Sequence, residues 1–199
     1  MVKEILGEEF EGVVVSDFYG GYNAHLGLHQ RCWVHLLRDI HEMKEKHGKD
    51  QSLREWAAKV KALYERAKGY KGPSAKLSQV EQQGERVRKQ REFERELLKV
   101  CRPHLRKKRA QSRLCERIER FLPELFVFVA EARVPADNNA AERSVREIVV
   151  SRKISGGSRS EKGSEAKSIL ASLFGTWKLQ GLDFYQCCLS LLAAQNPTL

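Results

Sequence analysis

The sequence predicts a mostly helical α/β chain with one or two short strands. Apolar residues recur at helical spacing through much of its 199 residues, which is the pattern of helices that bury one face. A run of three valines within EGVVVSDFYGG is instead typical of a buried strand. Glycine and proline clusters such as GYKGPS separate the segments. Because a lone buried strand leaves backbone groups unpaired, the sheet must have further strands.

The first half of the chain is predicted to hold this strand and three long helices. A short helical segment, VKEIL, precedes the strand GVVVS, and a helix within HQRCWVHLLRDIHEMKEKHG ends at Gly48. The next helix has the cleanest period, and its predicted buried face consists of Leu53, Trp56, Ala57, Val60, Leu63, Tyr64 and Ala67. Residues 76–101 form a more polar helix that Pro103 breaks. Its weak apolar stripe consists of Val80, Val87, Phe93 and Leu97.

Helices also dominate the second half. In SRLCERIERFLPELFVFVAEA, Pro123 marks either a kink or the first turn of a new helix. The apolar face of that stretch consists of Leu114, Ile118, Phe121, Leu122, Leu125, Phe126 and Val129. A further helix begins after Pro135 and runs to about Val150. EAKSILASLFGTWKLQG is an amphipathic helix that Gly181 ends, and LDFYQCCLSLLAAQ is a last helix with Asp183 as its N-cap.

The charge of the chain is strongly basic and concentrated. The net charge is +10, and residues 86–120 hold 14 Lys or Arg against 5 Glu. Such a stretch favours a polyanionic partner, nucleic acid first and an acidic membrane surface second, although a solvated helix face is the alternative. No apolar run approaches the roughly 20 residues that span a bilayer. Five cysteines, two of them adjacent, indicate a reducing cytosol rather than a disulfide framework.

Two carboxylates are candidate ligands, and each also has a structural interpretation. Asp17 follows the valine strand, where open α/β sheets place ligand-binding groups, but it can equally form the turn before FYGGY. Glu142 follows two asparagines and two alanines. Asn139 and Glu142 fit a capping box, whereas the small residues around the carboxylate leave room for a large ligand. Sequence spacing does not show whether Asp17 and Glu142 meet.

Two further motifs have weaker chemical signals. Cys32 and His35 have the spacing of half a zinc site, but no second pair with tight spacing completes four ligands. The loop SRKISGGSRSEKGS combines glycine backbone N–H groups with cations and suits phosphate binding, although an ordinary mobile loop has the same composition. It lacks the GK[ST] order of a Walker loop. The cations of this loop are Arg152, Lys153, Arg159 and Lys162.

Several stretches occur together in an order that resembles the insertion-sequence-66 family of DDE transposases. They are VVVSDFYGGYN, RCWVHLLRDI, VPADNNAAERSVR, VVSRKISGGSRSEKGSEAKSIL and GTWKLQGLDFY. The resemblance covers residues 1–47 and 130–192 well and the helical middle more loosely. It implies an incomplete ribonuclease H-like core that retains one or two strands. Residues 1–47 would form this partial core, residues 48–133 a large basic helical insertion, and residues 134–199 the C-terminal helical part of the core.

The resemblance also implies a site in which three carboxylates hold two Mg²⁺ or Mn²⁺ ions. Asp17 matches the second acidic position of the family and Glu142 the third. A C-x2-H signature of such enzymes is matched by the cysteine and histidine described above. The residues expected to support the site are Cys32, His35, Asn138 and Asn139. The residues expected to bind the DNA backbone are Arg143, Arg146, Arg152, Lys153, Arg159 and Lys162.

The activity that the resemblance implies is DNA transposition, by metal-dependent cutting and joining of DNA strands. The first acidic residue of the family pattern has no match before Asp17. The chain is therefore expected to be the C-terminal part of a larger bacterial, cytoplasmic transposase, with little or no activity alone. Its expected partners are DNA and a second copy or an intact transposase, but no membrane. Two alternatives stay open, a non-catalytic fragment that binds DNA or a transposase, and a helical scaffold in which Glu142 is only a cap.

Overall fold

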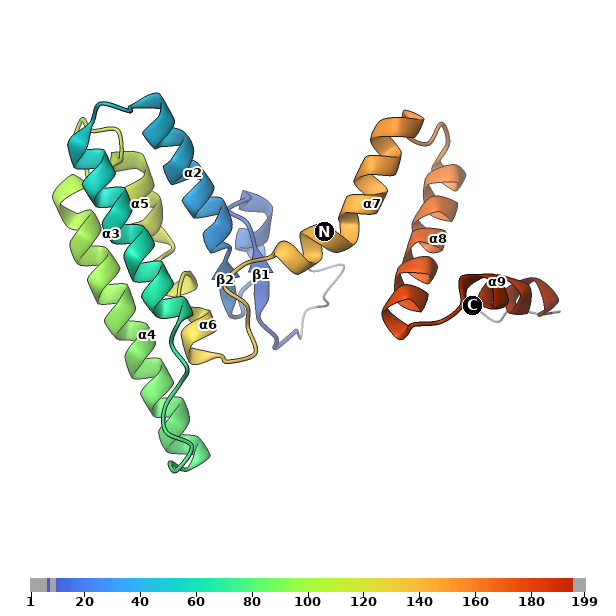
Figure 1. Ribbon diagram of the computed structural model, residues 1–199, viewed down its shortest axis with the longest axis horizontal. Coiled ribbons are helices and arrows are strands. Elements are labelled where there is room, and N and C mark those ends of the chain that lie inside the picture. The colour runs from blue at the N-terminus through green and yellow to red at the C-terminus, as the bar shows by residue number, and fades with distance from the viewer. Residues whose placement is uncertain (1–6, 8–9, 195–199) are drawn as a thin grey trace. The chain divides into compact units, whose positions relative to one another are not determined.

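The computed structural model describes residue 7 and residues 10–194, and these residues divide into two compact units between Asn138 and Asn139 (Figure 1). The predicted helical segment VKEIL lies outside the described residues. The first unit contains strands β1 (Val14–Ser16) and β2 (His29–Arg31) with helices α2 to α6, and the second contains α7, α8 and α9. The predicted division into residues 1–47, 48–133 and 134–199 stays a prediction.

The two strands of the first unit pair in parallel, with Val14 opposite His29 and Ser16 opposite Arg31. The strand predicted in GVVVS is confirmed, and β2 is the partner that its backbone needs. The connection between them contains a short 3-10 helix, η1 (Gly20–Ala24). The sequence prediction missed β2 because its three residues are polar, yet all three are buried. A two-stranded sheet in a mostly helical chain is consistent with the predicted class, whereas a ribonuclease H-like core stays a prediction.

Long helices form the core of the first unit. Helices α2 (Trp33–Lys46), α3 (Gln51–Lys68) and α4 (Gln79–Cys101) run in alternating directions, and α3 packs along α4 (Figure 1). All seven residues predicted for the buried face of α3 are buried. The stripe predicted on α4 is only half right, because Phe93 and Leu97 are buried whereas Val80 is 84% exposed. The indole of Trp33 stacks on the ring of Tyr64, with centroids 4.8 Å apart.

The stretch after α4 is more broken than the sequence predicted. It forms α5 (Ser112–Arg120), a 3-10 helix η3 (Leu122–Glu124) and α6 (Val127–Ala130), and Pro123 lies in the first turn of η3. Phe121 and Leu122 are only half-buried. The predicted apolar residues that are buried are Leu114, Ile118, Leu125, Phe126 and Val129. The apolar pattern therefore identified the core side of this stretch but not its helix breaks.

The second unit consists of α7 (Asn139–Ser155), α8 (Glu161–Gln180) and α9 (Phe184–Ala193). Helix α7 extends five residues beyond the predicted end at Val150. Gly181 ends α8 in a left-handed conformation with φ of 67°, and the carboxylate of Asp183 accepts a hydrogen bond from the backbone of Gln186, as predicted. None of the residues in these three helices is buried. Among the described residues, no helix is long and apolar enough to cross a membrane.

Candidate functional site at the carboxyl edge of the sheet

Asp17 lies directly after β1, at the carboxyl edge of the parallel pair. Its Oδ1 atom accepts a hydrogen bond of 2.9 Å from the backbone N–H of Tyr19, so the turn that the sequence allowed is present. Its Oδ2 atom has no hydrogen bond or ion pair within the described part of the chain. The turn therefore fixes one carboxylate oxygen and leaves the other available to a ligand.

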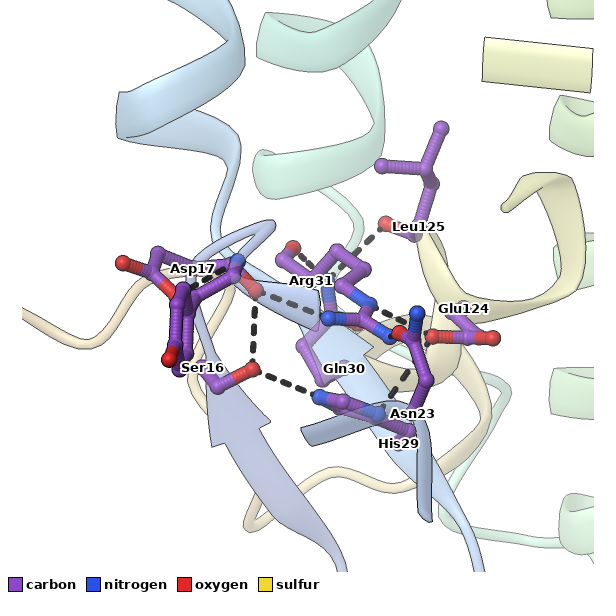
Figure 2. Close-up of polar contacts among 9 residues, drawn as sticks. Ser16, Asp17, Asn23, His29, Gln30, Arg31, Glu124 and Leu125 are labelled. Carbon is purple, nitrogen blue, oxygen red and sulfur yellow. Dashed lines mark hydrogen bonds and ion pairs between the residues drawn. The ribbon is translucent and has the colours of Figure 1, made fainter. Parts of the chain in front are cut away.

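The buried Arg31 holds the backbone of Asp17 in place. This side chain is 1% exposed, and its Nη1 donates to the carbonyl oxygen of Asp17 at 3.0 Å (Figure 2). Its Nε donates to Glu124 Oε2 at 2.7 Å and its Nη2 to Asn23 Oδ1 at 2.6 Å. The guanidinium also lies 4.6 Å above the ring of Phe121. A buried charge requires such pairing, and here the pairing connects the loop after β1 with η1 and η3.

His29 extends this network toward β1. Its Nε2 atom lies 2.7 Å from the hydroxyl of Ser16, and its Nδ1 atom lies 3.4 Å from Glu124 Oε2 (Figure 2). Burial, followed by the charge of Arg31, lowers the pKa of His29 to about 4, so the imidazole is neutral near pH 7. The order of hydroxyl, imidazole and carboxylate is that of a hydrolytic triad. However, Ser16 is only 2% exposed, so its hydroxyl braces the two strands rather than meeting a substrate.

The side chain of Gln30 in β2 makes hydrogen bonds to the backbone of the segment around α6. Its side-chain amide donates to the carbonyl of Leu125 at 3.1 Å and accepts from the N–H of Phe128 at 3.0 Å. The indole of Trp33 also donates to the carbonyl of Leu125. These bonds satisfy backbone groups of the irregular segment between η3 and α6, which would otherwise be buried without partners. Sequence reasoning missed this network because its partners lie more than ninety residues apart.

The segment that leads toward Glu142 is attached to the same edge of the sheet. The backbone N–H of Cys32 donates to the carbonyl of Ser16 at 2.7 Å, and the next N–H, that of Trp33, donates to the carbonyl of Ala136 at 3.0 Å. Two backbone hydrogen bonds therefore connect the residue before Asp17 to the VPADNN segment. Asn138, at the end of this segment, has a buried Oδ1 atom with no hydrogen-bond partner among the described residues.

The residues predicted to support the site lie in both units. Cys32 is fully buried at the N-cap of α2, and His35 is half-buried in the first turn of that helix. Asn139 begins α7, and Glu142 lies half-buried in its first turn. Because Asp17 and Glu142 belong to different units, their convergence stays a prediction, as does the choice between cap and ligand for Glu142. Within the described residues, no group of three or more His, Cys, Asp or Glu side chains is arranged to hold a metal ion.

The predicted DNA-binding residues all lie exposed in the second unit. Arg143 and Arg146 are on α7, and Arg159 precedes α8. Because α7 runs to Ser155, the loop is shorter than the sequence predicted, and two of its expected cations lie on the last turns of the helix. Gly156 and Gly157 have positive φ angles of 68° and 89°, which favours glycine at both positions. The remaining predicted cations, also exposed, are Arg152, Lys153 and Lys162.

Comparison with known proteins gives a family match over most of the chain. Residues 1–166 match the family model described as Transposase IS66 family. The uncharacterized protein y4jO of Sinorhizobium fredii (strain NBRC 101917 / NGR234) is 36% identical over 73 residues. Those residues are 37% of this chain and 23% of that protein, so the match spans less than a quarter of the relative's length. No solved structure matches the chain.

Proposed function

The chain belongs to the IS66 family of transposases, and from this premise we propose that it acts in DNA transposition through a metal site shared by Asp17 and Glu142. The proposal includes a ribonuclease H-like origin for the sheet and for α7 to α9, with the basic helices of residues 48–133 as an insertion. Bacterial cytoplasm is the proposed location, where DNA is accessible to the chain.

The hydrogen bond from the N–H of Trp33, two residues after β2, to the carbonyl of Ala136 is the observation that carries this proposal. The chain reaches the carboxyl edge of the sheet at Ala136, and Glu142 follows only six residues later. Six residues span at most about 20 Å when extended, so the length of the chain permits Glu142 to approach Asp17. The carboxyl edge of a parallel sheet is also where ligand-binding groups gather in α/β proteins.

The oxygen atoms of the proposed ligands are of the type that suits a hard divalent cation. Mg²⁺ prefers oxygen ligands and usually takes one or two carboxylates while it keeps several waters. Asp17 offers an unengaged carboxylate oxygen, and Asn138 offers a buried amide oxygen that has no other partner within residues 10–194. Glu142 would add the second carboxylate. When bound, Mg²⁺ or Mn²⁺ would supply Lewis-acid activation of a phosphodiester.

The protein's own groups would position the ligands and the DNA. Arg31 and the N–H of Tyr19 fix Asp17, while Arg143 and Arg146 would pair with phosphate oxygens one helical turn apart. The glycine backbone after α7, together with its neighbouring cations, would bind a further phosphate. Because the resemblance matches only two of the three family carboxylates in these 199 residues, we expect little strand cleavage by this chain alone.

A second candidate function is non-catalytic, and the surface of the second unit favours it. Large apolar side chains on α7, α8 and α9 are exposed, among them Val149, Leu170 and Leu191. Clustered exposed apolar residues commonly mark protein interfaces. In this role the chain would bind DNA and pair with itself or with an intact transposase, and no metal would be needed.

Metal binding by carboxylate variants separates the two functions. We expect Mn²⁺ titration, followed by electron paramagnetic resonance, to show at least about tenfold weaker binding in both Asp17→Asn and Glu142→Gln. Asn retains the oxygen that accepts from Tyr19, and Gln is compatible with a helix cap, so both variants should fold. Glu147→Gln, an exposed ion-pair residue on α7, is the matched control. Wild-type affinity in both site variants would exclude the shared metal site and leave the non-catalytic function.

A further inference from the structure

The connection between α4 and α5, together with the first turn of α5, has a concentrated positive charge and lies outside the proposed metal site. Residues 102–113, RPHLRKKRAQSR, contain six Lys or Arg and no Asp or Glu; we call them the cationic loop. All six cations are exposed. They are Arg102, Arg106, Lys107, Lys108, Arg109 and Arg113.

The cationic loop has a defined fold despite its exposure. It begins with a 3-10 turn, η2 (Arg102–His104), and Arg106 adopts a left-handed conformation with φ of 54°. The hydroxyl of the buried Ser112 lies 2.6 Å from the carbonyl of His104, and the amide of the buried Gln111 lies 3.1 Å from the His104 ring. These anchors fix the backbone that carries the cations, so a ligand would not have to order the backbone of the loop on binding.

The positive charges of the cationic loop are scarcely neutralised by the protein. Arg106 lies 3.7 Å from Glu119, and the other five cations form no ion pair with any described residue. Arg109 instead contacts the hydroxyl of Ser52. Burial, followed by the charges of Arg109, Lys107 and Lys59, lowers the pKa of His104, which is a second sign of a positive local potential.

We propose that the cationic loop is a binding surface for the phosphate backbone of duplex DNA. The loop has no Phe, Tyr or Trp, and the ring of His104 already contacts Trp56 and the amide of Gln111. Its contacts would therefore be independent of sequence. An acidic membrane would favour apolar side chains that insert, but Leu105, the loop's one large apolar residue, packs on the core. We choose DNA among the possible polyanions because of the proposed function. Binding of a polyanion by the cationic loop does not itself require a metal ion.

The test is the binding of a fluorescently labelled duplex of arbitrary sequence, measured by anisotropy in EDTA over a range of salt concentrations. The triple variant Lys107→Gln, Lys108→Gln, Arg109→Gln removes up to three phosphate contacts. Each phosphate contact contributes about 0.9 to the slope of log K against log salt. The loss of three contacts should therefore make this slope shallower by up to about 2.7. At 0.1 M salt we expect at least about tenfold weaker binding. Circular dichroism should show an unchanged melting temperature, because the three side chains are exposed.

A matched control makes the same charge change at the other end of the helices. Lys68→Gln, Lys71→Gln, Lys76→Gln alters three exposed lysines around the connection from α3 to α4 (Figure 1). Equal losses in both triple variants would reduce the effect to net charge and overturn the proposal. So would a loss of binding to phosphatidylserine vesicles with unchanged DNA binding. EDTA removes metal from every sample. The result would therefore be the same if Asp17 and Glu142 did not bind a metal ion.

Discussion

Replacing Arg31 by methionine should destabilise the first unit by about 3 kcal/mol, because the change leaves the partners of a buried guanidinium without donors. Three bonds are lost, to Glu124, Asn23 and the carbonyl of Asp17. Breaking a buried ion pair from one side typically costs about 3–5 kcal/mol. The Glu124 side chain is 31% exposed, so water screens part of its charge and the lower end of that range applies.

Urea unfolding followed by tryptophan fluorescence would measure this loss, because Trp33 and Trp56 are both buried in the first unit. Arg88→Met is the control, since Arg88 is 77% exposed in its ion pair with Glu85 and should cost no more than about 1 kcal/mol. Adding Glu124→Gln to Arg31→Met should restore part of the stability by removing the unpaired carboxylate. If Arg31→Met unfolds at the same urea concentration as Arg88→Met, the network does not hold the sheet as described.

Two further outcomes follow from single residues. The pKa of His29 is lowered from 6.5 to about 4 in the folded protein, so folding favours the neutral ring. The stability that depends on this neutral ring is fully present above pH 6.5. The free energy of unfolding should fall as pH decreases from 6.5 to 4, and His29→Gln should flatten this fall whereas the exposed His41→Gln should not. Gly181→Ala should cost about 1 kcal/mol, because φ of 67° strains any side chain although no atom lies within 4 Å of the added Cβ. Gly84→Ala, in helical backbone, should not destabilise the protein, and equal melting temperatures for both alanine variants would contradict this explanation.

The elements that the sequence predicted well are those whose evidence is local. The face of α3 repeats apolar residues over about four helical turns, and the N-cap role of Asp183 depends on a bond to a residue three positions away. Strand β2 could not be predicted in this way, because its burial depends on partners elsewhere in the chain. His29 and Arg31 are accommodated by Glu124, and no pattern within a short window contains that information.

The same distinction applies to the candidate site. The turn at Asp17 was predictable, because its hydrogen bond spans two residues. The guanidinium that fixes its carbonyl was not, although Arg31 follows a polar pair in a stretch that otherwise begins a helix. An arginine in a short polar run between a glycine-rich loop and an apolar helix is the signal that was available. It indicates a cation close to the sheet, but it does not identify the residues that neutralise it.

Stability alone does not account for the Arg31 network. A buried ion pair is often no more stable than apolar residues of the same volume, so a simpler core could hold η3 against the strands. The distinct effect of Arg31 is to fix the carbonyl of Asp17, and with it the backbone that directs the carboxylate. The double variant Arg31→Met, Glu124→Gln tests this role, since it should recover part of the stability without restoring that bond. If it binds Mn²⁺ as tightly as the wild type, the network serves only folding; if binding weakens while Glu142 is intact, the network positions Asp17.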